Sequence, residues 1–410
     1  MSTSAPKTPR LKWLRLFRAL RPSATRRKKV LTLFGTRPEA IKLAPVIRGL
    51  EANSDSIETI NVASGQHTDL LYPFARLLEI RIDRDLRVML PSQTPNQVCA
   101  RVMSAMDVIL EKEHPELILV QGDTTTALAG ALAGFHREIP VGHVEAGLRS
   151  GNPRSPFPEE MNRRMISRLA TYHFAATTRN RMTLLAEGVE KRNIFVTGNP
   201  VVDSLKAIVS RSSQRNPVLE QLLQNTNGLK RLILTTHRRE RFGELMMENL
   251  VTLRQFVESH KDVALIFPVH PNPAVVDAAR AALSHHSRIH LIEPLGYEDF
   301  IALLSEAWLI VSDSGGVQEE APTLGKPLLV LRENTERPEA LESGIARLVG
   351  ARPEALALML EEAYLDGSWA SQVGRIENPF GDGESGQRIA EIIAELINVQ
   401  VGRRTRAVSS

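Results

Sequence analysis

Short apolar runs that end in a polar or glycine-rich tip recur along this chain, and most of them are followed by a longer helix-like segment. Residues 30–34 and 117–120 are such runs in the first half, and residues 232–236 and 308–311 are such runs in the second. Short strands that alternate with helices are typical of a doubly wound parallel sheet. Because 410 residues exceed what one hydrophobic core usually serves, we expect an α/β fold with two doubly wound, Rossmann-like domains.

Basic residues are concentrated at the two ends of the chain. Residues 1–29 hold ten Lys or Arg and residues 401–410 hold three, with no acidic residue in either segment. The residues between them carry 38 basic and 47 acidic side chains, although the whole chain has a pI of about 9.3. An acidic body is not expected to bind nucleic acid. We expect residues 1–28 to form a basic arm, either disordered or a surface helix with weak membrane contact, and residues 403–410 to form a basic tail.

Several classes of protein and site are not indicated. Cys99 is the single cysteine, which excludes an internal disulfide, and no Cys/His spacing suggests a structural metal. No apolar run reaches the about 18 residues of a membrane-spanning helix, and the N-terminus lacks the apolar region of a secretion signal. We therefore expect a cytoplasmic protein. Neither a dinucleotide-binding glycine motif nor a Walker lysine motif follows the first strand, so we expect no cofactor and no metal.

Residues 307–325 read AWLIVSDSGGVQEEAPTLG and combine a short strand, a glycine turn and the start of a helix. Gly315 and Gly316 would let the backbone approach a ligand closely, and the free N–H groups at a helix start attract an anion. Ser314 suits a phosphate, and Glu320, one turn into the helix, suits the hydroxyls of a ribose. The alternative interpretation is an ordinary strand-to-helix turn that Ser314 caps.

Chemically active side chains follow successive strands at one end of the predicted sheets, where open α/β proteins bind their ligands. Any one of them alone would be consistent with a surface ion pair, but their common location predicts a shared active cleft. The residues at these tips are Arg37, Asp123, Glu145, His237, His270, Ser314 and Arg337.

Two kinds of charge are expected to meet in this cleft. Cations suit a diphosphate, because arginine can bind a phosphate through two parallel hydrogen bonds, and carboxylates suit proton transfer. The expected cations are Arg37, Lys42, His237 and Arg337. The expected carboxylates are Asp123, Glu145 and Glu159, whereas Glu160 is interpreted as a first-turn residue that complements a helix dipole. Without a NAD or ATP motif, the diphosphate is best assigned to a nucleotide sugar.

Six motifs within residues 29–399 closely resemble the non-hydrolysing UDP-N-acetylglucosamine 2-epimerases. Their length and their order along the chain make a chance match very improbable. The motifs are GTRPEAIK from Gly35, QGDTTT from Gln121, HVEAGLR from His143, THRRE from Thr236, DSGG from Asp313 and ERPE from Glu336.

The resemblance implies a two-domain fold like that of the GT-B glycosyltransferases, with a C-terminal helix that crosses back to the first domain. The first domain, residues 29–197 and about 388–402, would carry the carboxylates, and residues 198–387 would bind UDP. The implied reaction is reversible epimerisation at C2 of UDP-N-acetylglucosamine (UDP-GlcNAc) to UDP-N-acetylmannosamine (UDP-ManNAc), which supplies precursor for surface polysaccharide. It proceeds by anti elimination of UDP and re-addition, without NAD or metal, usually in a homodimer.

The resemblance also implies roles for individual side chains. By analogy, the acid/base carboxylates are Asp123, Glu145 and Glu159. The side chains that assist the departing diphosphate are Arg37, Lys42 and His237. The residues that hold the diphosphate and the ribose are Ser314, Gly315, Gly316 and Glu320, with Arg337 nearby. Two further substrate contacts are expected from His270 and from Phe300, which would lie near the uracil.

Three alternative functions remain open at this point. One is an epimerase of the same family that acts on a modified sugar of the UDP-diacetamido-uronate type. Another is a GT-B glycosyltransferase that moves the sugar to an acceptor. The third is a non-catalytic nucleotide-sugar sensor, and carboxylates at all three expected positions argue against it.

One departure from the family pattern concerns a regulatory site. Many bacterial members require a second UDP-GlcNAc beside the substrate, held by a glutamine matching Gln66, a second glutamine and an arginine. Here Asp69 and Ser92 occupy the second and third of these positions. A carboxylate in place of an amide, together with the loss of a cation, would repel a second diphosphate. We therefore expect this chain to lack the switch.

Overall fold

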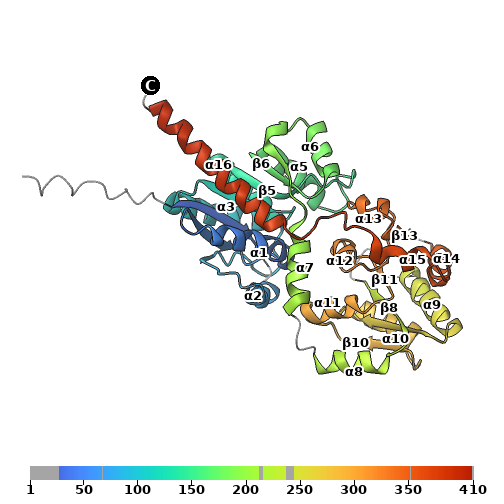
Figure 1. Cartoon of the computed structure of the whole chain (residues 1–410). Helices are drawn as coiled ribbons and strands as arrows, with labels where there is room; N and C mark the ends of the chain where they lie inside the picture. The colour runs from blue at the N-terminus through green and yellow to red at the C-terminus, as the bar shows by residue number, and fades with distance from the viewer. Residues whose placement is uncertain (1–26, 67, 212–215, 237–243, 351, 409–410) are drawn as a thin grey trace, which may run out of the picture.

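A computed structural model describes residues 27–66, 68–211, 216–236, 244–350 and 352–408. Within these residues the chain forms two lobes that lie side by side, each built around a parallel β-sheet (Figure 1). The expected α/β fold with two doubly wound domains is therefore confirmed. Residues 1–26 of the basic arm and His237 lie outside the described residues, whereas Lys28, the last residue of the expected arm, already belongs to a strand. None of the helices described is both long enough and apolar enough to cross a membrane.

The first sheet has the strand order β3-β2-β1-β4-β5-β6-β7, and all its pairings are parallel. This order places the switch point, where the chain reverses its direction of winding, between β1 and β4. Its strands are β1 (Lys28–Phe34), β2 (Ile57–Ala63), β3 (Arg84–Asp85), β4 (Leu117–Gln121), β5 (Val141–Ala146), β6 (Tyr172–Ala175) and β7 (Ile194–Val196).

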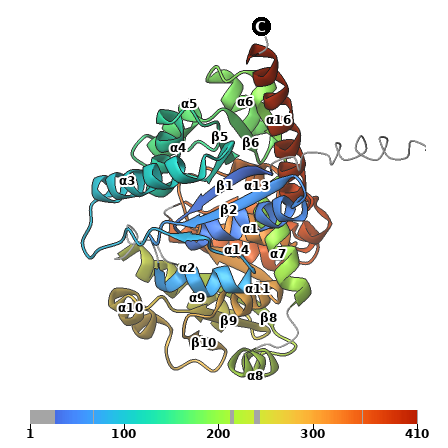
Figure 2. The ribbon, with the colours of Figure 1, turned by 90° about the vertical axis from the view of Figure 1, so that its left-hand side faces the viewer.

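Helices cover both faces of this sheet (Figure 2). Val30 and Phe34 of β1 pack toward α1 and the final helix, α16 (Ser385–Val408), whereas Leu31 and Leu33 pack toward α3 and α4, as the two-residue period of a strand requires. The helices of the first lobe are α1 (Arg37–Ala52), α2 (Thr68–Leu77), α3 (Pro95–Glu113), α4 (Thr125–His136), α5 (Glu159–Leu169) and α6 (Thr178–Ala186), with the 3-10 turn Lys191–Asn193.

The second sheet has the strand order β10-β9-β8-β11-β12-β13, again parallel throughout. Its strands are β8 (Lys230–Thr235), β9 (Val263–Pro268), β10 (Ile289–Ile292), β11 (Leu309–Ser312), β12 (Leu328–Val330) and β13 (Ala346–Leu348). Its helices are α8 (Pro217–Asn225), α9 (Glu244–Ser259), α10 (Pro273–Leu283), α11 (Tyr297–Ser305), α12 (Val317–Thr323), α13 (Pro338–Glu342), α14 (Pro353–Tyr364) and α15 (Trp369–Gln372), with the 3-10 turn Val373–Arg375.

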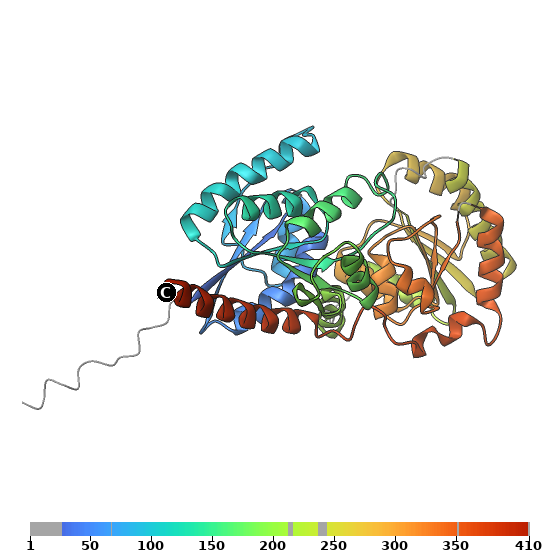
Figure 3. The ribbon, with the colours of Figure 1, turned by 90° about the horizontal axis from the view of Figure 1, so that it is seen from above.

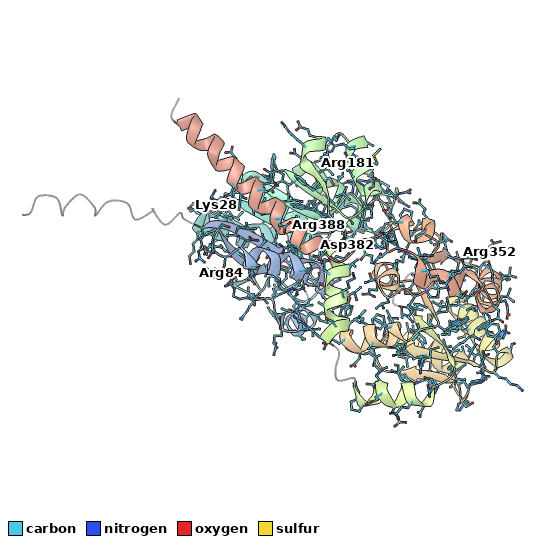
Figure 4. The ribbon with its side chains drawn as sticks, viewed as in Figure 1. Lys28, Arg84, Arg181, Arg352, Asp382 and Arg388 are labelled. Atoms are coloured by element: carbon cyan, nitrogen blue, oxygen red, sulfur yellow. The ribbon has the colours of Figure 1, made fainter. Side chains whose placement is uncertain are left out.

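Two segments cross between the lobes. The first leads from β7 through Gly198 and Asn199 into α7 (Pro200–Arg211), and the second leads into the final helix, α16 (Ser385–Val408). The Asn199 N–H donates to the Phe380 carbonyl at 2.7 Å, so the two crossings run against each other. Asp382 and Arg388 form an ion pair where α16 begins (Figure 4).

Helix α16 returns to the first lobe and packs along α1, as expected (Figures 1 and 3). Glycines allow this close approach: a Cβ at Gly386 would lie 2.5 Å from the carbonyl carbon of Pro45, and one at Gly49 would lie 2.8 Å from the Ala390 Cβ. The helix continues to Val408, so residues 403–408 are helical instead of forming a separate tail. No proline interrupts residues 385–408, and the backbone hydrogen bonds can therefore continue.

Candidate active site

Contacts between the lobes bring the strand tips of both sheets together. Lys42 of α1 has its Nζ in ion-pair contact with Glu145 Oε1 at the end of β5, and 2.9 Å from Glu319 Oε2 on α12 of the second lobe. The Arg337 Nε lies 2.6 Å from Glu319 Oε1. Asn199, on the crossing segment, directs its Nδ2 to Glu145 Oε1 at 3.1 Å and to Glu319 Oε1 at 3.2 Å. We call these five residues the cleft network.

Glu145 is held in an unusual backbone conformation. Its φ is 65°, in the left-handed region that a residue with a Cβ rarely adopts, and the register of β5 against β6 shifts at this point. Gln121, at the tip of the neighbouring β4, donates from Nε2 to Glu145 Oε2 at 2.5 Å. The turn at the end of β5 therefore directs this carboxylate toward the contact between the lobes, where Lys42 and Asn199 hold it.

The buried charges of the cleft network shift one another's ionisation. Burial alone would raise the pKa of Glu145, but the Lys42 and Arg337 cations outweigh it and hold that pKa below its ordinary value. Burial raises the pKa of Glu319, and the Glu145 charge adds to this effect against Arg337 and Lys42. The pKa of Lys42 is raised, because the two carboxylates outweigh the effect of burial. Two neighbouring carboxylates in one site therefore differ in their affinity for a proton.

A second group of contacts lies where α1 meets α11. The Arg37 Cζ lies 5.1 Å from the centroid of the Phe74 ring and 5.9 Å from that of Tyr297. The Tyr297 hydroxyl donates to Glu320 Oε1 at 2.9 Å. Burial raises the pKa of Glu320 to about 7. Phe300, one turn along α11 from Tyr297, is half-buried against the core.

Asp123 follows β4 and is held by α5. Its Oδ2 lies 3.1 Å from the Arg163 Nε, and its carbonyl accepts from Asn162 Nδ2 at 2.9 Å. Glu159, the first residue of α5, is half-buried. The interpretation of Glu160 as a dipole-complementing residue is incomplete: it is fully buried, lies 3.3 Å from Arg163 Nη1 and accepts from the Ser150 N–H at 2.9 Å. Glu160 therefore fixes the arginine that orients Asp123.

Glu39, which the sequence motif contains but to which no role was assigned, joins two of the tips. Its Oε2 accepts from the Gly35 and Thr36 N–H groups at 3.0 and 2.8 Å, and its Oε1 accepts from Thr124 Oγ1 at 2.7 Å. Burial raises its pKa to about 7. The tips after β1 and β4, which carry Arg37 and Asp123, are thereby held in one arrangement.

The turn formed by Gly315 and Gly316 leaves space for the side chain of Arg337. A Cβ at Gly315 would lie 3.0 Å from Arg337 Nη1, so a larger residue there would push the guanidinium away by a few tenths of an ångström. Helix α12 begins at Val317 with Gly316 at its N-cap, and Ser314 does not cap it. Ser314 is half-buried, and its N–H donates to Ser312 Oγ at 3.0 Å.

The structure thus joins Lys42 to Glu145 directly, and Glu319 links Lys42 to Arg337. His270 lies apart from these contacts, because it is exposed and its Nδ1 accepts from the N–H of Asn272 in its own turn. Sequence reasoning missed Glu319 and Asn199. Glu319 precedes Glu320 in sequence, and Asn199 lies where the chain was expected to pass from the first domain to the second. These neighbouring positions were the only sequence features that pointed to the two residues.

A substitution at Gly35 tests the packing of the first tip. A Cβ there would lie 2.2 Å from Ser64 Oγ and 2.7 Å from Thr126 Oγ1, two buried hydroxyls that bond each other at 2.9 Å. We expect Gly35→Ala to lower the free energy of unfolding by about 1–3 kcal/mol and to lower kcat/KM, because Arg37 follows two residues later. The matched control is Gly296→Ala, where no atom lies within 4 Å and φ is −58°. If denaturant titration shows that Gly35→Ala and Gly296→Ala lower the free energy of unfolding by the same amount, the proposed steric conflict at Gly35 is wrong.

The fold and the site together define a two-domain α/β enzyme whose lobes meet at a buried network of lysine, arginine, glutamate and asparagine side chains. The UDP-N-acetylglucosamine 2-epimerase family matches residues 50–394, and the chain belongs to this family. A relative from Yersinia pestis, named UDP-N-acetylglucosamine 2-epimerase, is 43% identical over 370 residues, which are 89% of this chain and 98% of the relative.

Solved structures agree with this assignment. The UDP-GlcNAc 2-epimerase from Neisseria meningitidis, bound to UDP-GlcNAc, is 39% identical, with a TM-score of 0.83 over 90% of this chain and all of that one. The glycotransferase of kitacinnamycin is 14% identical, with a TM-score of 0.62 over 91% of this chain and all of that one, and it shares the fold alone. The GT-B-like arrangement implied by the sequence motifs is therefore confirmed.

Proposed function

We propose that this chain interconverts UDP-GlcNAc and UDP-ManNAc by moving the proton at C2 of the sugar. The observation that carries the proposal is the position of Glu145, a buried carboxylate paired with Lys42 where the two lobes meet. The relatives of this chain support the choice of substrate, since the structure of one of them is bound to UDP-GlcNAc. In this proposal Arg37, Lys42 and Arg337 bind the diphosphate, as does His237, and Ser314 to Glu320 hold the diphosphate and ribose.

The chemistry explains why several carboxylates are needed. The C2 hydrogen of the sugar is barely acidic, so removing it requires an outlet for the negative charge. Anti elimination provides one, because UDP leaves C1 while the proton leaves C2, and the cations stabilise the departing diphosphate. UDP then adds back to the glycal while C2 is protonated on the opposite face. Two opposed faces require more than one acid/base group, and we assign these roles to Asp123, Glu145 and Glu159.

Product analysis tests the proposal. The full chain incubated with UDP-GlcNAc and no added cofactor should form UDP-ManNAc until the two sugars reach equilibrium, which proton NMR follows directly. A UDP-diacetamido-uronate that is converted while UDP-GlcNAc is not would assign the chain to the modified-sugar branch. Transfer of the sugar to an acceptor with no change at C2 would replace the epimerase by a glycosyltransferase.

We further propose that the enzyme is a cytoplasmic homodimer that supplies precursor for surface polysaccharide. Exposed apolar side chains on the stacked helices α3, α4 and α5 support a dimer, including Val108, Phe135 and Met165. Light scattering should give about twice the chain's mass of 45.5 kDa. A monomeric mass at assay concentrations would contradict the dimer.

We also propose that this chain lacks the second-nucleotide switch, which leads to a kinetic prediction. Ser92 is exposed and brings no cation to its position, and Asp69 replaces an amide. Pure UDP-ManNAc should therefore be converted at once, with no lag and a hyperbolic dependence of rate on concentration. A lag that traces of UDP-GlcNAc abolish would show that the regulatory site is retained.

A further inference from the structure

Glu319 is a buried carboxylate that the proposed mechanism does not use. It is 1% exposed, the Arg337 Nε lies 2.6 Å from its Oε1, and the Lys42 Nζ lies 2.9 Å from its Oε2. The Lys42 contact is an ion pair without hydrogen-bond geometry, so Oε2 accepts no hydrogen bond from the described part of the chain. Glu319 therefore stands between the two cations that the proposed function assigns to the diphosphate, one from each lobe.

The charges around Glu319 balance without a ligand. Two cations, Lys42 and Arg337, face two carboxylates, Glu145 and Glu319, and all four side chains are largely buried. At the edge of this group, Glu336 contacts Arg337 through its Oε1, and its Oε2 lies 3.1 Å from the Arg332 Nη2, so Glu336 and Arg332 add one charge of each sign. A diphosphate that reaches Lys42 and Arg337 brings negative charge to a neutral buried group. An excess of negative charge is unfavourable in a buried site, and the binding of a proton removes part of that excess.

The two carboxylates of the cleft network are close enough to share a proton. Lys42 Nζ and Asn199 Nδ2 each contact both of them, and the two carboxyl groups come within hydrogen-bonding range of each other. In such a pair like charges resist simultaneous ionisation. Glu319 is the member with the greater affinity for a proton, because its pKa is raised while that of Glu145 is lowered.

We propose that Glu319 is a positioning residue that takes up a proton from solvent when a diphosphate binds to Lys42 and Arg337, and so leaves Glu145 ionised. The inference rests on the proposed function, because it takes the nucleotide diphosphate as the ligand of these cations. The diphosphate replaces Glu319 as their partner, and the neutral Glu319 carboxyl donates to Glu145. Glu145 thereby keeps the charge that it needs to act on C2.

The other ionisable groups near Glu319 are distinguished from it by their contacts. Glu320 lies on the same helix but bonds to Tyr297 of α11 and faces Arg37 of α1. Glu336, beside Arg337 in sequence, contacts two arginines, and although burial alone would raise its pKa, Arg337 and Arg332 lower that pKa to about 2. Neither bridges the cations from the two lobes, so neither is expected to take the proton.

Calorimetry of UDP binding to the full chain tests the inference. At about pH 8, where the phosphates of free UDP are fully ionised, the dependence of the observed heat on the ionisation enthalpy of the buffer gives the protons taken up. We expect an uptake of at least about half a proton per UDP bound. Because binding takes up a proton, the affinity for UDP should fall as pH rises, by up to about tenfold per pH unit.

Matched variants identify the group that takes the proton. Glu319→Gln should still bind UDP but show no proton uptake and a flat dependence of affinity on pH, whereas Glu319→Asp should restore both. Glu336→Gln, which removes a carboxylate from the same arginine, and Glu320→Gln should retain the uptake. If Glu319→Gln does not fold, infrared difference spectra of the wild type decide: a protonated-carboxyl band on UDP binding supports the inference, and its absence overturns it.

Two calorimetric outcomes overturn the inference: UDP binding to the wild type without proton uptake, and unchanged uptake in Glu319→Gln. No binding of UDP to the wild type is a different result, because it contradicts the proposed function itself.

Discussion

Replacing Asp123 by Asn is expected to lower kcat by about 10²- to 10⁴-fold, the usual contribution of an acid/base group. The amide has the shape of the carboxylate but cannot accept or return the proton at C2. The affinity for UDP should change little, because Asp123 lies at the tip of β4 in the first lobe, whereas Ser314 to Glu320 lie in the second. Steady-state rates and UDP calorimetry measure the two effects separately, and Glu159→Gln should behave in the same way.

A surface aspartate provides the control. Asp107 also bonds to an arginine, with its Oδ1 2.6 Å from the Arg137 Nε, but it is exposed and far from the strand tips. Asp107→Asn should leave kcat unchanged, which separates the loss of an arginine partner from the loss of an acid/base group. A kcat for Asp123→Asn close to that of wild type, in a variant that melts normally, would remove Asp123 from the catalytic set.

Replacing Lys42 by Met is expected to lower the free energy of unfolding by about 3–5 kcal/mol, because it leaves buried carboxylates without their cation. Lys42 is 6% exposed and contacts both Glu145 and Glu319. Turnover should be lost as well, since the diphosphate loses a cation and Glu145 loses the partner that keeps it ionised. Denaturant titration measures the first effect and steady-state rates the second.

A double variant isolates the electrostatic cause. Lys42→Met with Glu319→Gln removes one cation and one carboxylate together, and we expect it to recover a large part of the lost stability without recovering turnover. If the double variant is less stable than the single one by the full cost of Glu319→Gln alone, the two side chains are not coupled. The ion pair would then have no part in holding the lobes together.

The features that the sequence predicted share a physical cause. Buried parallel strands appear in the sequence as continuous apolar runs. The polar residues that follow each run mark the carboxyl end of the strand, where open α/β sheets bind their ligands. Both features can therefore be recognised from the sequence. Strand β3 illustrates the limit. It consists of Arg84 and Asp85, has no apolar residue, and joins the sheet through backbone pairing with β2. A strand that forms only through backbone pairing with its neighbour has no apolar sequence pattern by which it could be predicted.

Site residues were predicted correctly where a sequence motif identifies a single residue. They were missed where only the fold determines which of several similar residues reaches the site. Glu319 and Glu320 are adjacent in sequence, and their chemistry is identical. Only the rotation between successive helix residues sends Glu319 to Lys42 and Arg337 and Glu320 to Tyr297. Asn199 reaches both carboxylates because it lies on the segment that joins the lobes, and such a contact depends on how the lobes pack.

The measurement that tests the central claim most directly is incubation of the full chain with UDP-GlcNAc in D₂O, followed by proton NMR of the recovered nucleotide sugars. If Asp123, Glu145 and Glu159 remove and return a proton at C2, both UDP-ManNAc and the recovered UDP-GlcNAc should carry deuterium at C2 and at no other carbon. UDP-ManNAc that retains the original hydrogen at C2 would contradict elimination and re-addition. Recovery of UDP-GlcNAc with neither product nor exchange would contradict the assignment of the cleft as a C2-epimerising site.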